Sequence, residues 1–211
     1  MNDLETYFRQ NTGRLIHKWE HYFEIYDRHF SRFRGTDVHV VEFGVSQGGS
    51  LQMWKNYFGP ACMIYGIDIN PHCEMLAEDQ VRIFIGDQED RGFLRELAGK
   101  IPRIDILIDD GGHRMRQQIA TYEELFPHVH ENGVYLCEDM HTAYGPIGEA
   151  GTAGGGPSWN TRKTSSTRCM PGIQNSPALS LSPSLPARST LSIFTTASSL
   201  SRNVRSALLP T

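Results

Sequence analysis

The chain has 211 residues and a net charge of −4 at pH 7, which is long enough for one α/β domain and gives no sign of a nucleic-acid-binding surface. No stretch approaches 18 apolar residues and the sequence MNDLETYFRQ has no apolar signal-peptide core, so we expect a cytoplasmic protein without a membrane span. Its cysteines form no CxxC pair, which is typical of free thiols: Cys62, Cys73, Cys137 and Cys169.

The predicted elements alternate between helices and strands. A helix is expected over residues 3–34, where apolar side chains recur at steps of three and four: Leu15, Trp19, Tyr22, Phe23, Tyr26 and Phe30. Strands are expected over Val38–Phe43, Met63–Ile69, Val81–Ile85, Ile104–Ile108 and Gly133–Cys137. Further helices are expected over Ser50–Phe58, over Phe93–Leu97 and over a segment with one apolar face of Met115, Ile119, Tyr122, Leu125 and Phe126.

This alternation predicts the fold class. Strands separated by helices at such spacing imply right-handed βαβ units. We therefore predict an α/β, Rossmann-like, doubly wound fold with a mostly parallel sheet that is buried on both faces. Ligands of such sheets bind beyond the carboxyl ends of the strands.

The sequence changes character near residue 150. Residues 1–150 hold all 24 acidic residues against 14 Lys and Arg, whereas residues 151–211 hold no acidic residue, six Lys and Arg, and many Ser, Thr and Pro. Composition therefore predicts a disordered tail and missing C-terminal edge strands. We divide the chain into a helical segment (1–35), an α/β domain (36–150) and this tail (151–211).

A frameshift is one explanation of the tail. Read two nucleotides later, allowed codons for residues 155–171 can encode a charged amphipathic helix, and those from Ser192 onward can encode a strand. These are the elements that a doubly wound sheet still needs after its fifth strand. We hypothesise a frameshift near Gly145–Gly155, which resequencing of the DNA tests.

A glycine-rich turn follows the first strand. Its sequence from Glu42 to Ser50 has the pattern ExGxxxGxS, in which Gly44 and Gly48 allow a tight turn and a close approach of the backbone to a ligand. A dinucleotide pyrophosphate favours GxGxxG instead, so the pattern suits a ligand without phosphates, such as S-adenosylmethionine. An ordinary β–α turn is the alternative.

Two acidic sites follow the next strands. Asp68 ends the second strand, where an acid can accept both hydroxyl groups of a ribose. Asp87 and Gln88 follow the third strand and could contact an adenine edge. The alternatives are a helix N-cap or turn acid for Asp68 and helix-capping acids in a solvated loop for Gly86–Asp90.

Paired acids end the fourth and fifth strands, in ILIDDGGH and YLCED. Neighbouring parallel strands lie about 4.8 Å apart, so Asp110, Glu138 and Asp139 can converge if these strands are adjacent. Three carboxylates without a thiolate favour Mg²⁺ or Mn²⁺. His113, beyond two glycines, could remove a hydroxyl proton as a general base. Capping of the following helices is the alternative for these acids, and a helix-capping or surface histidine is the alternative for His113.

Histidines also lie among the aromatic residues of the first helix, at His17, His21 and His29. A packed amphipathic face is the favoured interpretation. A lid over the substrate is the alternative.

Residues 38–145 together resemble class I S-adenosylmethionine-dependent methyltransferases. The resemblance rests on VEFGVSQGGSLQMW, YGIDI, GDQED, ILIDDGGH and YLCEDMHTAY. It is closest to the metal-dependent O-methyltransferases that act on deoxysugars of macrolide antibiotics, some of whose relatives carry a cephalosporin-hydroxylase label. The tail departs from the family, which ends with a helix and antiparallel edge strands.

The resemblance implies residue roles. S-adenosylmethionine would be bound by Glu42, Gly44, Gly48, Ser50, Asp68, Asp87, Gln88 and Asp109. The magnesium ligands would be Asp110, Glu138 and Asp139, and Asp110 and His113 would be catalytic, with His113 as the base. The family also implies a homo-oligomer.

We therefore predict an enzyme that methylates a hydroxyl group of a sugar or a glycosylated natural product in antibiotic biosynthesis. Three alternatives remain: a nicotinamide-dependent oxidoreductase, which the missing GxGxxG disfavours; an inactive methyltransferase-like fragment; and a hydroxylase, for which no two-His-one-carboxylate set is apparent. We expect neither a nucleic acid nor a membrane as partner.

Overall fold

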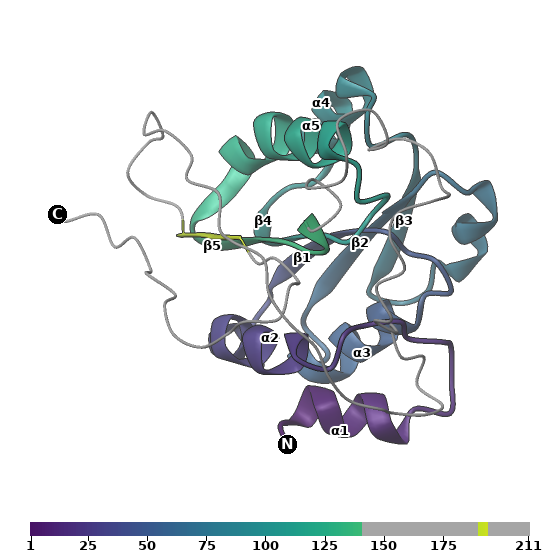
Figure 1. Cartoon of the computed structure of the whole chain (residues 1–211), viewed down its shortest axis with the longest axis vertical. Coiled ribbons are helices and arrows are strands. Elements are labelled where there is room, and N and C mark those ends of the chain that lie inside the picture. The colour runs from purple at the N-terminus through teal and green to yellow at the C-terminus, as the bar shows by residue number, and fades with distance from the viewer. Residues whose placement is uncertain (141–189, 194–211) are drawn as a thin grey trace, which may run out of the picture.

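The structure is a computed structural model that describes residues 1–140 and 190–193. Its middle layer is a parallel sheet with the strand order β3-β2-β1-β4-β5-β6 (Figure 1). The strands are β1 (His39–Phe43), β2 (Met63–Asp68), β3 (Val81–Ile85), β4 (Ile104–Asp109), β5 (Val129–Cys137) and β6 (Thr190–Ile193). This order, with β1 and β4 at the centre and one crossover, confirms the predicted α/β doubly wound fold.

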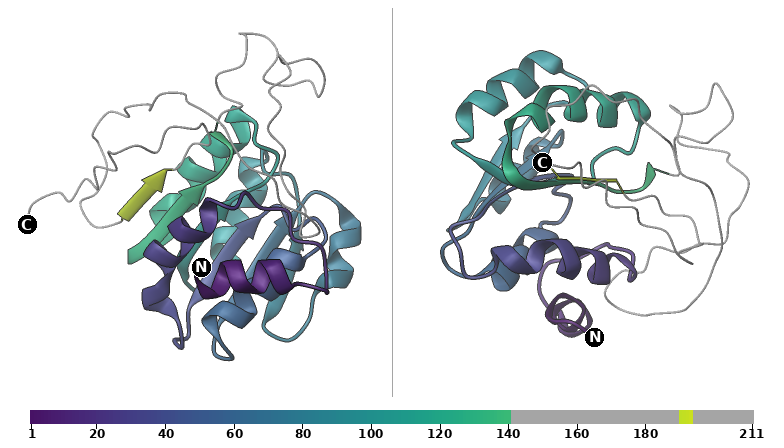
Figure 2. Two further views of the ribbon diagram at one scale, coloured as in Figure 1. Left: turned by 60° about the horizontal axis from the view of Figure 1, so that its bottom comes forward. Right: turned by 90° about the vertical axis from the view of Figure 1, so that its left-hand side faces the viewer.

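Helices cover both faces of the sheet. One face carries α2 (Tyr22–Phe30) and α3 (Gly49–Phe58), with α1 (Asp3–Gln10) packed outside these two helices. The other face carries α4 (Arg91–Lys100) and α5 (Met115–Leu125) (Figure 2). Short 3₁₀ turns complete the set: η1 (Ser31–Phe33), η2 (Pro71–Leu76) and η3 (Phe126–His128). Among the helices of the described residues, none is long and apolar enough to cross a membrane.

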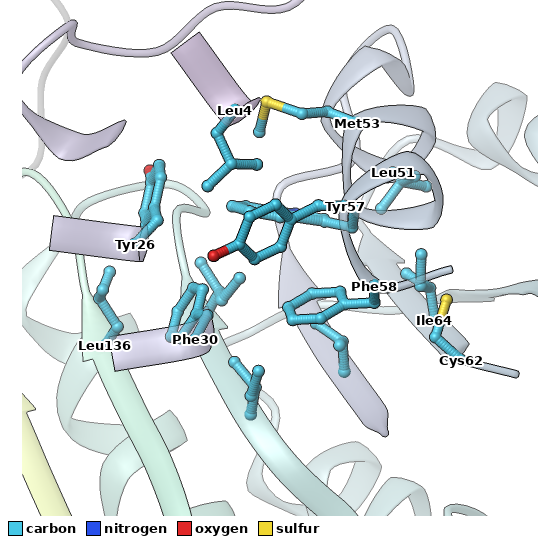
Figure 3. Packing of buried hydrophobic residues seen from close by; sticks show 14 of the residues in the cluster. Leu4, Tyr26, Phe30, Leu51, Met53, Tyr57, Phe58, Cys62, Ile64 and Leu136 are labelled. Atoms are coloured by element: carbon cyan, nitrogen blue, oxygen red, sulfur yellow. The ribbon is translucent and has the colours of Figure 1, made fainter. Parts of the chain in front are cut away.

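The core beneath the sheet is aromatic. Tyr26 and Phe30 of α2 stack on each other and meet Trp54 of α3 edge-to-face, with ring centroids 5.0 and 5.9 Å from the indole. Leu4 of α1 and Met53 of α3 join the same cluster (Figure 3). Because the N-terminal helices share one core with the sheet, residues 1–35 pack as part of the α/β unit in the structure.

The predicted helix over residues 3–34 is wrong in its middle. The chain is helical in α1 and α2, but residues 11–21 between them are not helical. Asn11 ends α1 in an extended conformation. The segment beyond alternates like a strand, with Ile16 and Lys18 buried, whereas Leu15 is 45% exposed. The helical spacing that included Leu15 was therefore coincidental.

The other helix predictions differ in detail. Helix α4 spans Arg91–Lys100 and is longer than predicted, because Asp90 caps its first turn by accepting hydrogen bonds from the backbone N–H groups of Gly92 and Phe93. Helix α5 lies where the pattern placed it, but Met115 and Ile119 of its expected apolar face are 42% and 43% exposed.

The tail contributes one described segment. Thr190–Ile193 forms β6 and pairs in parallel with Val134–Cys137 of β5, whereas we expected the C-terminal edge strands to be missing. The predicted disorder of the rest of the tail, the proposed site of the frameshift and Cys169 lie outside the described residues. Cys62, Cys73 and Cys137 are buried free thiols, as predicted.

Two glycines give a matched test of this packing. A Cβ at Gly66 in β2 would lie 2.7 Å from Val45 Cγ2 and 2.9 Å from Ile83 Cδ1, whereas Gly99 in α4 has open space around it. Gly66→Ala should lower the free energy of unfolding by about 1–3 kcal/mol through overpacking. Gly99→Ala should raise it by about 0.5–1 kcal/mol. Urea denaturation measures both; equal effects would contradict the packing around β2.

Candidate functional site

Strand register brings the candidate residues to one edge of the sheet. The backbone N–H of Gly44 donates to the carbonyl of Ile67, at 2.9 Å. That of Asp110 donates to the carbonyl of Phe43, and that of Glu138 to the carbonyl of Asp109, at 3.2 and 2.8 Å. The residues that follow β1, β4 and β5 are therefore adjacent, as the sequence predicted for Asp110 and the Glu138–Asp139 pair.

A cavity of about 340 Å³ opens at this edge. Six of the predicted site residues line it: Gly44, Asp68, Asp87, Gln88, Asp110 and His113. The others do not: Glu42, Gly48, Ser50, Asp109, Glu138 and Asp139. The cavity therefore joins the predicted cofactor-binding turns after β1, β2 and β3 to Asp110 and His113 of the predicted metal and catalytic site.

Gly44 sets how closely two turns approach. It has a φ of +90°, and a Cβ there would lie 2.1 Å from the carbonyl oxygen of Asp110. Nearby, Asp68 accepts hydrogen bonds from the backbone N–H groups of Ser46 and Asn70, both at 2.9 Å. Asp68 thus organises the turns, as its structural alternative proposed, and it also lines the cavity.

Asp87 and Gln88, in the loop after β3, have different surroundings. Asp87 is exposed in the cavity wall, whereas Gln88 is buried and donates to Asp109 Oδ1 at 2.7 Å and to Thr121 Oγ1 at 2.9 Å. Burial raises the pKa of Asp109 to about 6, although the hydrogen bonds from Gln88 and Tyr135 act in the opposite direction. Because the Gln88 amide is engaged with Asp109, Asp87 is the freer of the two to meet a ligand.

Glu42 and Ser50 lie beneath the cavity. The Glu42 carboxylate is fully buried and accepts hydrogen bonds from Ser50 Oγ at 3.0 Å and Trp54 Nε1 at 3.1 Å. Gly48, in the left-handed conformation at φ +75°, precedes α3. These residues shape the turn, and the structure does not bring their side chains to the cavity surface.

Three side chains form a candidate metal group. A carboxylate oxygen from Asp110 and one from Asp139, with a ring nitrogen of His113, all lie within 4.8 Å of one another. His113 Nε2 lies 3.7 Å from Asp110 Oδ1 and 3.6 Å from Asp139 Oδ2. Asp110 Oδ1 is buried and has no hydrogen-bond partner, so a cation there would satisfy it.

Backbone strain marks the same edge. Ser46, His113 and Asp139 have φ values of 50°, 56° and 52°, in the left-handed region that non-glycine residues rarely adopt. They follow β1, β4 and β5. Strained residues concentrate at functional sites because surrounding contacts must hold them there.

Glu138 is not a member of the metal group in this structure. It is 1% exposed and its Oε1 accepts hydrogen bonds from Lys18 Nζ at 2.9 Å and from Tyr26 OH at 2.5 Å. Burial, followed by the charge of Asp110, raises the pKa of Glu138, and Lys18 offsets this only in part. In this structure Glu138 thus binds Lys18 and Tyr26 and lies outside the candidate metal group. Its role as a metal ligand stays a prediction.

The N-terminal segment supplies residues that the sequence did not single out. Lys18 is 2% exposed, and its Nζ lies 2.8 Å from Asp110 Oδ2 and 3.2 Å from Glu42 Oε1. Trp19 Nε1 donates to Asp139 Oδ1 at 3.0 Å, and Tyr22 OH accepts from the backbone N–H of Asp139 at 3.1 Å. In the sequence, a lysine between aromatic residues is typical of the polar face of a helix. The tertiary contacts alone identify Lys18 as a residue of the site.

The charge of Lys18 follows from its neighbours. Burial alone would lower its pKa, but the carboxylates of Asp110 and Glu138 outweigh burial and hold the pKa well above its usual range. Lys18 is therefore an ammonium ion within the acid group.

The helix-capping alternative does not account for Asp110 or His113. Helix α5 begins at Met115 with Arg114 at its N-cap, whereas Asp90 fills that role for α4. Of the N-terminal histidines, His17 lines the cavity, as the lid interpretation requires, and His21 packs against Tyr22 with ring centroids 4.6 Å apart.

Comparisons with known proteins identify methyltransferases as similar to this chain. Residues 41–140 match the family model described as a methyltransferase domain. The demethylmacrocin O-methyltransferase of Streptomyces fradiae is 42% identical over 130 residues, which cover 57% of this chain and 32% of that protein. The mycinamicin VI 2″-O-methyltransferase of Micromonospora griseorubida is 43% identical, also over 130 residues, with the same coverage. The chain thus spans about a third of the length of these relatives.

A solved structure gives the same picture. The methyltransferase MycE of the mycinamycin biosynthetic pathway, in complex with Mg and SAH, superposes with a TM-score of 0.56 at 42% identity. The match covers 58% of this chain and 35% of MycE. The chain therefore has a Rossmann-like fold, and its residues 41–140 are similar to a methyltransferase domain. Within that class, it is similar to the O-methyltransferases that modify sugars of antibiotics, as the sequence motifs predicted.

A glycine pair tests the close approach at the site. Gly44 and Gly35 both have positive φ values, +90° and +72°, but a side chain at Gly35 would meet open space. Gly35→Ala should cost about 1–2 kcal/mol of stability through backbone strain alone. Gly44→Ala should cost about 1–3 kcal/mol more, because its methyl group displaces the Asp110 backbone. Chemical denaturation measures the difference; equal losses would argue against the contact.

Proposed function

We propose that this protein transfers the methyl group of S-adenosylmethionine to a hydroxyl group of a sugar or a glycosylated natural product, with the assistance of Mg²⁺ or Mn²⁺. One observation carries the proposal: Gly44, Asp68 and Asp87 line the same cavity as Asp110 and His113. A cofactor on the first three residues would meet an acceptor at the last two. The relatives described above are named for such transfers.

The cofactor half suits an adenosyl group. Asp68, at the end of β2, has the position from which an acid accepts the hydroxyl groups of a ribose. Asp87 would meet the adenine from the loop after β3, above the buried Gln88–Asp109 pair. Gly44 would let the amino acid portion approach the backbone, while Glu42, Gly48 and Ser50 hold that turn from beneath.

The residues present fit a divalent cation. Two carboxylates and an imidazole gather in one group, and Oδ1 of Asp110 has no hydrogen-bond partner there. Oxygen ligands are those that Mg²⁺ and Mn²⁺ prefer. Asp110 and Asp139 would hold the ion, with Glu138 as the third acid behind them. When bound, the ion would lower the pKa of the acceptor hydroxyl group and orient it.

His113 would then receive the hydroxyl proton at Nε2. Its ring is 23% exposed at the cavity wall, so an acceptor can reach it. Asp110 and Asp139 on either side would stabilise the imidazolium ion that forms. Binding of both ligands in one cavity would hold the acceptor oxygen in line with the methyl carbon of S-adenosylmethionine.

Binding measurements test the proposal without knowledge of the acceptor. Isothermal titration of the full chain with S-adenosylmethionine, with and without Mg²⁺, should show a saturable site. A thermal-shift comparison should show stabilisation by S-adenosylmethionine and none by NAD. Stabilisation by NAD alone would indicate an oxidoreductase, and binding of neither would indicate an inactive fragment. The homo-oligomer and the cytoplasmic location expected from the sequence also stay predictions.

His113→Ala tests the base. It should retain the affinity for S-adenosylmethionine but lose about 10²–10⁴-fold in methyl transfer to a glycosylated macrolide acceptor, because general-base catalysis contributes that much. His128→Ala is the control, since His128 is exposed in η3 at the opposite, amino end of the sheet. Unchanged turnover of His113→Ala would remove His113 from the base role.

A further inference from the structure

Lys18 is the feature that the proposed reaction does not use. Its Nζ contacts Asp110 Oδ2 at 2.8 Å, Glu138 Oε1 at 2.9 Å and Glu42 Oε1 at 3.2 Å, and the side chain is 2% exposed. No other lysine or arginine of the described residues pairs with these three carboxylates. One buried ammonium ion thus joins the ends of β1, β4 and β5.

The three carboxylates cannot all stay ionised at this edge of the sheet without a compensating positive charge. Glu42 and Glu138 are 0% and 1% exposed, and the Asp110 side chain is 10% exposed. Isolated ionised groups are costly to bury, and like charges at this spacing repel one another. Neutral donors from Ser50, Trp54 and Tyr26 satisfy single oxygens but add no positive charge.

Lys18 also determines which carboxylate oxygens remain available to the metal group of Asp110, His113 and Asp139. It holds Asp110 by Oδ2, which leaves Oδ1 toward His113. It holds Glu138 by Oε1, together with Tyr26. Lys18 therefore contacts Glu42, Glu138 and Asp110 Oδ2, and it leaves Asp110 Oδ1 and Asp139, both buried, outside its own contacts.

The extended N-terminal segment delivers Lys18 to this position. A Cβ at Gly49 would lie 2.3 Å from the carbonyl oxygen of Leu15 and 2.4 Å from that of Arg14. The segment therefore lies directly on the first turn of α3, which only a glycine permits. Ile16, 1% exposed, anchors it in the core two residues before Lys18.

We propose that Lys18 is a built-in counter-cation and positioning residue, which allows the acid group to fold without a metal ion and presents Asp110 to the cation site. The inference rests on the proposed function only for the identity of the metal. Lys18 touches the carboxylates and not the cavity, so it acts through Asp110 and Glu138. Its loss should make the stability of the protein depend on divalent cations.

The test measures thermal unfolding of the full chain in EDTA and in millimolar Mg²⁺. Lys18→Met keeps the aliphatic stem and removes the charge. It should lower Tm in EDTA by roughly 10 °C, because one partner of a buried ionic group is lost. Mg²⁺ should restore more of the Tm of this variant than it adds to the wild type. Unchanged Tm in EDTA would overturn the proposal.

A second variant keeps the test decisive if Lys18→Met folds poorly. Lys18→Met/Glu138→Gln removes one negative charge together with the lysine, and should unfold at a higher temperature than Lys18→Met. Glu138→Gln in the wild-type background should lower Tm, because Lys18 then loses a partner. A double variant no more stable than Lys18→Met would overturn the charge role.

The variant Lys18→Arg distinguishes the role of the positive charge from a purely structural role of the side chain. This variant retains the positive charge and should keep the wild-type difference between EDTA and Mg²⁺. If Lys18→Arg matches Lys18→Met in its Mg²⁺ response, the charge is not the determinant. Rescue by Glu138→Gln without any effect of Mg²⁺ would support Lys18 and overturn the metal assignment alone.

Discussion

The burial of carboxylates at one edge of a parallel sheet is the constraint on which the rest of the molecule depends. Parallel register places the ends of β1, β4 and β5 side by side, and Glu42, Asp110 and Glu138 occur there. Ionised groups in a low-dielectric interior need both charge compensation and hydrogen bonds. The aromatic layer of α2 and α3 supplies the hydrogen bonds through Tyr26 and Trp54, and the extended N-terminal segment supplies the charge.

This constraint explains why the N-terminal segment is not a continuous helix. A helix through residues 11–21 would carry Ile16 and Lys18 to different sides, because successive residues rotate by about 100°. An extended segment turns both side chains to the same side, where Ile16 is buried in the core and Lys18 pairs with the acids. The low helix propensity of Asn11, Thr12 and Gly13 agrees with the end of α1 at this point.

Local pattern predicted much of the fold and part of the site. The strands, the parallel sheet and the convergence of Asp110 with Asp139 follow from apolar runs that end in acids, which are readable without tertiary information. Lys18 was not predictable, because its partners lie 92 and 120 residues away along the chain. The same reason applies to Glu42, whose carboxylate turns toward Trp54 and Lys18, a direction that only packing decides.

The two parts of the site differ in how they couple function to stability. The wall formed by Asp68, Asp87 and His113 is partly open to solvent, so substitutions there change ligand contacts while removing little packing. The acids beneath are buried against one another and against Lys18, so neutralising one leaves its partners uncompensated. A substitution at the wall is therefore expected to affect mainly ligand binding and turnover, whereas a substitution among the acids or of Lys18 is expected to lower stability as well. A divalent cation at Asp110 and Asp139 would add positive charge next to the carboxylate oxygens that Lys18 does not contact. Because the same excess of negative charge opposes folding and favours cation binding, metal binding would stabilise the folded state.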